Sequence, residues 1–332
     1  MKKYLPLFLI VLLPLFACEK SEDQDLLINR TIIEMATDKD ITNTAVPPSG
    51  FYNPYSYAGS VRLKGQMHCH TTNSADGNYS PSQLAALFKE AGYDFFTITD
   101  HDYITTEPQG NELIWLCNSY ESTQMTHQCV YNAGSVLKGV LSIKDVIDYQ
   151  VYRRSAVVGL AHPDWFRHRV GADDLINACK GTSFVEVWNG TMNTSLGENT
   201  PRAWDTMLSN NLRVLGLAVD DLHAAGDLKK GWVEVLSMSR SRDDIMFALL
   251  KGAFYATNGA TIDAVEYRRD TITIHTGSPS AITTFYGTDG VQLGEKIVGE
   301  NAQYGITGSE KYVRAIVKEK GKYCWTQPIF LK

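Results

Sequence analysis

The sequence predicts an α/β domain followed by a small domain built from β-strands alone. Between about residues 60 and 260, short apolar runs alternate with amphipathic helical segments, which is the pattern of a parallel α/β architecture. After Gly259 only strand-like runs remain, as in a β-sandwich-like domain. The length of 332 residues, 44% of them hydrophobic, supplies enough core for two domains. We therefore expect domains at residues 60–260 and 261–332.

The first helix of the α/β domain has the clearest boundaries. Ser80 and Gln83 form a capping-box pair, and Pro81 suits the first helical position. Gly92 is a typical residue at the end of a helix. Strands are expected on either side, at residues 61–67 and 94–99.

The other expected elements follow in chain order. In the α/β domain they are a helix from Ser142, a strand at 156–160, a helix near 172–179, a strand at 183–187, a helix from 200–201, strands at 212–219 and 232–238, and a helix from Ser241 to Gly252. In the β domain they are strands at 264–268, 271–275 and 282–286, and a hairpin that pairs 312–317 with 323–331.

The N-terminus has the features of a secretory signal. Lys2 and Lys3 precede an apolar run from Leu5 to Ala17, which is shorter than the roughly 20 residues that a membrane-spanning helix needs. Residues 1–17 are thus expected to be a signal peptide. Cys18 follows in a context that resembles the lipobox of bacterial lipoproteins, so we expect export and a lipid anchor to the cell envelope on Cys18, with ordinary cleavage as the alternative. Residues 18–59 are read as a tether and lead-in.

Charge and cysteine content narrow the classes of partner. Lys and Arg number 31 against 37 Asp and Glu, for a net charge of −6, so the chain lacks the basic field that binding to polymeric nucleic acid needs. No protein partner is identifiable. Five cysteines remain besides Cys18 and cannot all pair internally, and a bridge between Cys117 and Cys129 stays open.

The positions of the histidines predict a metal site. Six of the eight lie at or just beyond predicted strand ends or in the loops that follow: His68, His70, His101, His127, His162 and His223. The carboxyl ends of parallel strands face one crevice, and alternate residues of a strand point the same way, so two imidazoles of a His-x-His motif reach one ion. Asp76, Glu121 and Asp221 add carboxylates. A single such motif is also common on surfaces, but the conjunction favours Zn, Mn or Fe rather than Ca.

The same motifs resemble the polymerase and histidinol phosphatase (PHP) family of metal-dependent phosphoesterases, in the family's order. They are Gln66-Met67-His68-Cys69-His70-Thr71, Ser74-Ala75-Asp76-Gly77, Thr97-Ile98-Thr99-Asp100-His101, Ala161-His162-Pro163 and Asp220-Asp221-Leu222-His223. The resemblance implies a distorted (β/α)7 barrel with a site for two or three metal ions at the carboxyl ends of its strands.

Carried over to this sequence, the family's ligands form three groups. One ion would be held by His68, His70, Glu121 and Asp221, a second by Glu121, His127 and His162, and a third by Asp76, His101 and His223. Glu121 is the expected bridging carboxylate, although Ser119 stands where the family often has glycine. The implied reaction is hydrolysis of a small phosphomono- or diester by a metal-bound hydroxide, with His101 or His223 protonating the leaving group if not bound to metal.

Softer similarities extend over the rest of the chain and leave the reaction open. Trp204-Asp205, Lys230-Gly231-Trp232-Val233, residues 252–259 and residues 324–328 resemble a two-domain exported branch related to carbaryl-type hydrolases. A carboxyl-ester or carbamate hydrolase, an amidohydrolase and a non-catalytic lipoprotein that binds metal or glycan are therefore kept as alternatives.

Several charged residues near these motifs carry two interpretations each. Asp100 and Asp220 either orient neighbouring ligands or cap a helix or turn. A second group either meets an anionic substrate group or lies on the surface: Lys138, Arg153, Arg154 and Arg167.

Overall fold

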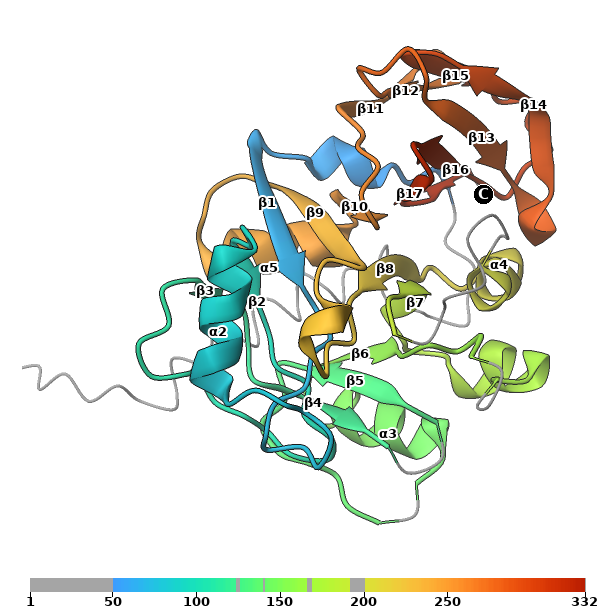
Figure 1. The fold of residues 1–332 in the computed structure, drawn as a ribbon. Coiled ribbons are helices and arrows are strands. Elements are labelled where there is room, and N and C mark those ends of the chain that lie inside the picture. The colour runs from blue at the N-terminus through green and yellow to red at the C-terminus, as the bar shows by residue number, and fades with distance from the viewer. Residues whose placement is uncertain (1–49, 124–125, 140, 166–168, 192–200, 332) are drawn as a thin grey trace, which may run out of the picture.

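The computed structural model describes residues 50–123, 126–139, 141–165, 169–191 and 201–331. It confirms a mixed α/β fold with many strands and few helices. Figure 1 shows the strands that follow residue 260, coloured orange to red, gathered at one end of the molecule, with the remaining strands and the helices at the other. The expected signal peptide, Cys18, most of the tether and Arg167 lie outside the described residues.

The largest sheet contains ten strands and runs through both parts of the chain. Its order is β14 (Gln292–Val298), β13 (Ile282–Tyr286), β16 (Tyr312–Glu319), β17 (Lys322–Thr326), β10 (Phe254–Thr257), β9 (Trp232–Ser237), β1 (Val61–Gln66), β2 (Phe95–Phe96) and β3 (Ile114–Trp115), with β18 (Ile329–Phe330) paired to β16. Only β1, β2 and β3 pair in parallel along this path. At the centre, β9 is antiparallel to both β1 and β10.

A second sheet of five strands lies beside the first. Its order is β4 (Ser119–Ser122), β5 (Gln128–Tyr131), β6 (Val157–Leu160), β7 (Phe184–Asn189) and β8 (Leu215–Val219). The strands β6, β7 and β8 are parallel, whereas β5 is antiparallel to both neighbours. Isolated bridges join this sheet to segments that follow β1 and β2, at Cys69–Leu222 and His101–Glu121.

The expected (β/α)7 barrel does not appear. Among the described residues there are three sheets, and none closes on itself. The departure has a local cause, because β4 and β5 form an antiparallel hairpin with no helix between them, and β9 runs antiparallel to β1. Both pairings interrupt the parallel strand–helix alternation on which a closed barrel depends.

The helices begin where their caps predict. In α2 (Pro81–Glu90), Ser80 accepts from the backbone N–H of Gln83, whose side chain in turn accepts from that of Ser80. Ser142 caps α3 (Ile143–Gln150) in the same way. The other α-helices described are α4 (Arg202–Ser209) and α5 (Arg242–Lys251), the latter capped by Ser241 and ended by Gly252 at φ +76°. The helix expected near 172–179 contains a π-helical turn, η2 (Asp174–Ala178).

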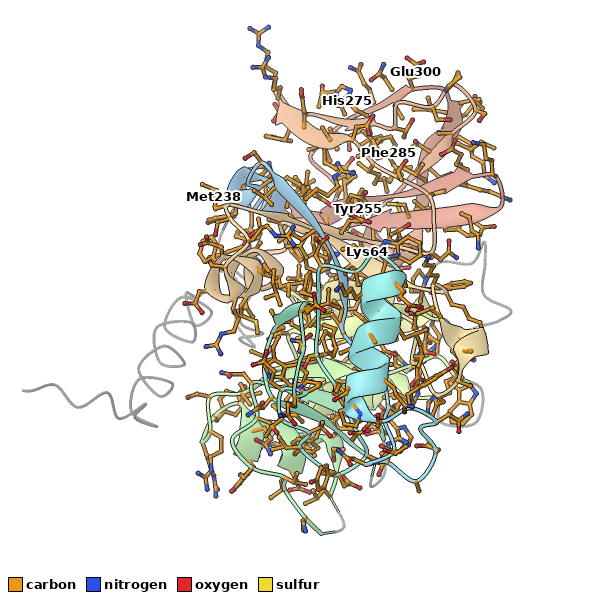
Figure 2. The ribbon with its side chains drawn as sticks, turned by 60° about the vertical axis from the view of Figure 1, so that its left-hand side comes forward. Lys64, Met238, Tyr255, His275, Phe285 and Glu300 are labelled. Atoms are coloured by element: carbon orange, nitrogen blue, oxygen red, sulfur yellow. The ribbon has the colours of Figure 1, made fainter. Side chains whose placement is uncertain are left out.

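The C-terminal strands agree with the expected positions, with two additions. A three-stranded sheet of β11 (Ala264–Arg268), β12 (Thr271–His275) and β15 (Asn301–Gly305) lies near β13 and β14. The sequence reading missed β14 and β15. The core of this region includes Tyr255 and Phe285, both nearly fully buried, whereas Figure 2 shows Met238 at the outer edge of the strands and His275 and Glu300 near the far end.

The large sheet continues across the expected domain boundary. Tyr255 to Thr257 on β10 pair with Cys324 to Thr326 on β17, so strands from either side of residue 260 share one hydrogen-bonded ladder. The division into residues 60–260 and 261–332 stays a prediction.

The five described cysteines are all buried and unbridged, so Cys117 and Cys129 do not form the disulfide that the sequence left open. In the part of the chain that the structure describes, no helix combines the length and apolar character that crossing a bilayer requires.

Candidate metal centre

Most candidate ligands lie on segments that follow strand ends, and all come together where the two larger sheets meet. His68 and His70 follow β1, His101 follows β2, His162 follows β6, Asp221 and His223 follow β8, Glu121 lies on β4 and His127 just precedes β5. Backbone hydrogen bonds tie these segments together. The N–H of Asp221 donates to the His68 carbonyl at 3.1 Å, and that of Glu121 donates to the Asp100 carbonyl at 3.1 Å.

Glu121 occupies the centre of the cluster and is almost fully buried. Its Oε2 lies 3.3 Å from His68 Nε2, 3.4 Å from His70 Nε2 and 3.0 Å from His101 Nδ1. Its Oε1 lies 3.0 Å from His127 Nδ1 and 3.3 Å from His162 Nε2. The two carboxylate oxygens thus face two different sets of imidazoles.

Asp221 completes the innermost group. Its Oδ1 lies 3.2 Å from the Nε2 atoms of both His68 and His70. Those two nitrogens are themselves 3.1 Å apart. All three side chains are buried, so the group presents carboxylate and imidazole atoms to one point below the protein surface.

The outer group lies on the solvent side. Asp76 Oδ2 is 3.0 Å from His101 Nε2 and 3.3 Å from His223 Nε2. The side chain of Asp76 is 46% exposed and that of His101 25% exposed. His101 contacts both Asp76 and Glu121, and so joins the outer group to the inner one. A ligand from solvent would reach the cluster on this side.

The structure brings together all nine residues that the sequence singled out. Four sets of described residues have ligand atoms within 4.8 Å of one another. One is His68, Cys129 and Glu186, of which the sequence had singled out only His68. The other three contain only predicted ligands: His68, His70 and Asp221; Glu121, His127 and His162; and His70, Asp76, His101 and His223. These correspond closely to the three expected groups, with His70 also near the outer one. The binding of metal by these residues stays a prediction.

The donor set fits divalent cations. Neither oxygen of Glu121, nor Oδ1 of Asp221, accepts a hydrogen bond of normal geometry, although all three atoms are buried. A buried carboxylate without such partners is costly unless a positive charge neutralises it. Imidazole nitrogens and carboxylate oxygens are ligands of Zn, Mn and Fe. A cation bound among these atoms would satisfy them.

The histidines of the cluster stabilise the charged forms of its two buried carboxylates. Burial by itself raises the pKa of Glu121, but the charge of His68 and contacts with the other imidazoles hold that pKa well below its usual range. For Asp221 the same opposition, again with His68 as the largest opposing cause, lowers the pKa. Burial lowers the pKa of His70. The two carboxylates are therefore ionised at neutral pH, as metal ligands must be.

No role was predicted for Glu186 or Asn189, which are among the polar residues that contact the ligands. Glu186 and Asn189 lie on β7, are buried, and hydrogen-bond to His68 and Asp221 respectively. A signal was available in the sequence, because Glu186 interrupts the apolar run Phe184-Val185-Glu186-Val187-Trp188. A charged residue within a buried strand indicates a specific partner.

The structure favours the turn role for Asp100 and Asp220. Asp100 accepts from the backbone N–H of Thr71 at 2.6 Å and from its hydroxyl at 2.7 Å. Asp220 accepts from the N–H groups of Lys230 and Gly231 at 2.6 and 2.8 Å. Burial raises the pKa of Asp220 to about 6 against the effect of these amides. Both carboxylates hold the segments that carry neighbouring ligands.

Three of the basic residues considered as contacts for an anionic substrate group lie on the surface, and the fourth, Arg167, lies outside the described residues. Arg153 and Arg154 are exposed, and Arg154 donates to the Tyr149 hydroxyl at 2.9 Å. Lys138 is exposed as well.

Comparison with known proteins places these observations in context. No protein-family model matches the sequence, and no curated protein matches it. Among solved structures, the chain is similar to a two-domain protein from Bacteroides vulgatus that contains a predicted PHP-like metal-dependent phosphoesterase. The identity is 14%, the match covers 86% of this chain and 91% of that one, and the TM-score is 0.49.

Two other structures cover less of the chain. One is a protein from Bifidobacterium adolescentis assigned as a metal-dependent phosphoesterase, at 16% identity over 55% of this chain and 90% of that one, with a TM-score of 0.37. The other is an amidohydrolase from Chromobacterium violaceum with bound sulfate and no metal, at 13% identity over 49% and 88%, with a TM-score of 0.35. At these TM-scores the similarity assigns no activity, and the geometry of the site carries the functional conclusion.

Proposed function

We propose that the chain is a metal-dependent phosphoesterase of the PHP type that hydrolyses a small phosphomono- or diester. The observation that carries the proposal is the position of Glu121. Its Oε2 faces the His68 and His70 pair, and its Oε1 faces the His127 and His162 pair, at 3.0 to 3.4 Å. A buried carboxylate between two imidazole pairs is suited to bridge two divalent cations.

Three groups of residues would each hold one metal ion. His68, His70, Glu121 and Asp221 would hold one ion, Glu121, His127 and His162 a second, and Asp76, His101 and His223 a third. Bound divalent cations lower the pKa of water and stabilise negative charge on phosphoryl oxygens. The buried inner residues exclude bulk water, and the partly exposed outer residues face the approaching substrate.

His223 has a defined tautomer. Its Nδ1 lies 2.8 Å from the backbone carbonyl oxygen of Asp221, and because a carbonyl only accepts, Nδ1 carries the proton. The lone pair of Nε2 then faces Asp76 at 3.3 Å. This arrangement prepares Nε2 as a metal ligand, the usual mode of a histidine whose other nitrogen donates to a carbonyl.

The outer group has two roles that depend on metal number. With three ions bound, His101 and His223 serve as ligands beside Asp76. With two ions bound, both histidines face solvent next to the inner group, where a proton donor to the leaving group would lie. Metal analysis of the purified protein separates the two cases by the number of ions per chain.

The activity test is an initial-rate panel on the protein supplied with Mn²⁺ or Zn²⁺. The substrates are chromogenic phosphomonoesters, phosphodiesters, carboxyl esters and carbamates. The site variant is the double change His68→Ala and His70→Ala. The control is His275→Ala, which removes a partly exposed histidine on β12 that contacts Asn301 and Glu266.

The outcomes separate the candidate functions. Phosphoester turnover that needs metal, survives His275→Ala and is lost in the double variant supports the proposal. Turnover confined to acyl substrates would contradict the proposal and identify the protein as a carbamate or carboxyl-ester hydrolase or an amidohydrolase. Stoichiometric metal binding with no turnover across the panel favours a binding lipoprotein.

We also propose that the mature protein is tethered through a lipid on Cys18, a residue outside the described part of the chain. The support is the basic, apolar and cysteine-ending pattern of residues 1–18. Phase partitioning of Cys18→Ser in the native host checks it, with Ser21→Ala as control. The lipid assignment fails if the two variants partition alike into the detergent phase.

A further inference from the structure

A buried polar pair lies behind the inner ligands on β7. Glu186 is 3% exposed and Asn189 is fully buried. Both belong to a strand whose other side chains are mainly apolar, and neither is among the proposed ligands. Burying an ionisable group beside an amide is costly unless the polar atoms of both form hydrogen bonds. The partners in those hydrogen bonds therefore indicate the role of the pair.

Glu186 contacts two of the proposed ligands. Its Oε1 lies 2.6 Å from His68 Nδ1. Its Oε2 accepts from the backbone N–H of His162 at 2.7 Å and from Asn189 Nδ2 at 2.9 Å. One carboxylate therefore holds a side chain that follows β1 and a backbone group that follows β6.

Asn189 extends this network to a third ligand. Its Nδ2 donates to Asp221 Oδ2 at 3.0 Å as well as to Glu186. The backbone N–H of Thr191 donates to Asn189 Oδ1 at 3.1 Å. That contact sets the orientation of the amide, because its oxygen must face Thr191 and its NH₂ must face the two carboxylates. Asp221 is left with Oδ1 directed at His68 and His70.

The contact with Glu186 determines how His68 presents itself. A carboxylate at 2.6 Å from Nδ1 accepts the ring proton. In the neutral ring that metal binding requires, the lone pair of Nε2 then faces Glu121 Oε2 at 3.3 Å and Asp221 Oδ1 at 3.2 Å, where the proposed ion would lie. Histidine ligands of metals commonly have such a carboxylate behind them, which holds both the tautomer and the ring orientation.

The backbone at two of these ligands needs external support. His162 has φ +26° and Asp221 has φ +52°, in the left-handed region that side chains other than glycine rarely adopt. Such a conformation persists only where its surroundings hold it. Glu186 holds the first through the His162 N–H, and Asn189 holds the second through the Asp221 carboxylate.

We propose that Glu186 and Asn189 are positioning residues that set the tautomer of His68 and the placement of His162 and Asp221 before metal binds. The proposal rests on the metal centre of the proposed function. It predicts that the pair acts on metal affinity and not only on stability of the fold, which separates it from an ordinary buried polar contact.

The decisive change is Glu186→Gln. Glutamine keeps the shape of the side chain but has one acceptor oxygen in place of two, and its NH₂ would face donors. We expect the Kd for Zn²⁺, measured by calorimetry on the full chain, to rise about 10- to 100-fold. Asn189→Ala is the second variant, and its effect should be in the same direction, because it removes the hydrogen bonds of the amide to Asp221 and Glu186.

The matched control is Glu310→Gln, which also replaces a buried carboxylate with several donors. Glu310 is 3% exposed and accepts from Thr307 N, Thr307 Oγ1 and Gly308 N at 3.1, 2.9 and 3.0 Å. Its donors are the residues of its own loop and Tyr304, and none is a proposed ligand. This change should lower stability and leave the Kd for Zn²⁺ unchanged.

A second readout reports the ring of His68 directly. In Zn²⁺-loaded protein with ¹⁵N-labelled histidine, we expect a downfield Nδ1–H resonance from the hydrogen bond to Glu186, assigned by its absence in His68→Ala. That resonance should move upfield in Glu186→Gln and stay in place in Glu310→Gln. A purely structural role would not move it selectively.

Three results overturn the inference, and they are distinguishable. If wild-type protein binds no Zn²⁺ at the cluster, the proposed metal centre fails and this inference fails with it. If wild-type protein binds Zn²⁺ and Glu186→Gln binds it within twofold with an unmoved resonance, only the positioning role is wrong. If Glu310→Gln weakens Zn²⁺ binding as much as Glu186→Gln, the effect is one of general stability.

Discussion

A buried ion pair joins the C-terminal strands to a helix of the α/β part, and its removal is a sharp test of how the two are coupled. Arg314 on β16 donates to both oxygens of Asp205 on α4, from Nε at 3.0 Å and from Nη2 at 2.8 Å to each oxygen. The hydroxyl of Tyr312 donates to the same carboxylate at 3.0 Å. Arg314 is 1% exposed and Asp205 is 5% exposed.

The loss of unfolding free energy depends on whether a charge stays buried without its partner. Asp205→Ala leaves the guanidinium of Arg314 buried without its counter-charge, and breaking a buried pair in this way costs about 3–5 kcal/mol. The double change Asp205→Ala with Arg314→Leu removes both charges. Its remaining cost is mainly the unpartnered hydroxyl of Tyr312 and imperfect packing, about 1–3 kcal/mol. Against a typical unfolding free energy of about 5–15 kcal/mol, the single change is severe.

Urea unfolding followed by tryptophan fluorescence measures both variants. Trp204 is a suitable probe, since its ring lies 4.9 Å from the guanidinium carbon of Arg314. The control is Arg240→Ala, which breaks the exposed pair with Asp94 at 2.9 Å and should cost at most about 1 kcal/mol. The reasoning is refuted if Asp205→Ala costs no more than this control, or if the double variant is as unstable as the single one.

Four further predictions concern stability and metal. Gln327→Ala should lower the unfolding free energy by about 1–3 kcal/mol in urea titrations, because its amide pairs with both backbone groups of Gly216 at 2.8 Å and no other side chain replaces it; an unchanged midpoint would contradict this. Ser142→Ala should cost about 1 kcal/mol by removing the N-cap of α3, and a similar loss in Ser142→Thr would show that the cap is not the cause. Hydrogen bonds from Tyr304 and Thr307 outweigh burial and lower the pKa of Glu310 to about 2, so its stabilisation is complete above the ordinary pKa near 4.5 and is lost as pH falls toward 2. Melting temperatures of Glu310→Gln should therefore fall less steeply than those of the wild type over that pH range. Finally, a chelator should lower the melting temperature of metal-loaded protein and added Zn²⁺ should restore it, whereas an unchanged melting temperature would contradict a metal centre.

Local features of this fold were predictable from sequence because their causes lie within a few residues. The helix α2 begins at Pro81 with the capping pair of Ser80 and Gln83, as predicted, and Gly252 caps the end of α5. The positions of most strands were also confirmed, since a short apolar run between turn residues reports its own burial. Approximate positions of the strand ends were enough to predict that the histidines lie close together at one edge.

The pairing of strands could not be read in the same way. A strand-like run has the same pattern whether its neighbour is parallel or antiparallel. The strands β4 and β5 were not predicted, and the hairpin that they form replaced the alternation that a barrel requires. The ladder between β10 and β17 likewise joins residues on either side of the expected boundary at 260. Such pairings depend on which distant surfaces meet, and no local signal encodes that.

For the candidate site, the sequence by itself determined the nine side chains with the chemistry to bind metal, because residue type and position relative to strand ends carry that information. The tertiary structure alone decided that Glu121 lies between two imidazole pairs and that Glu186 stands behind His68, 118 positions away in the chain. The physical reason is that a hydrogen bond between buried groups depends on packing of whole strands, whereas ligand chemistry belongs to each residue. The residue types thus determine which ligands the site is able to bind, and the packing of the fold determines how those side chains are positioned.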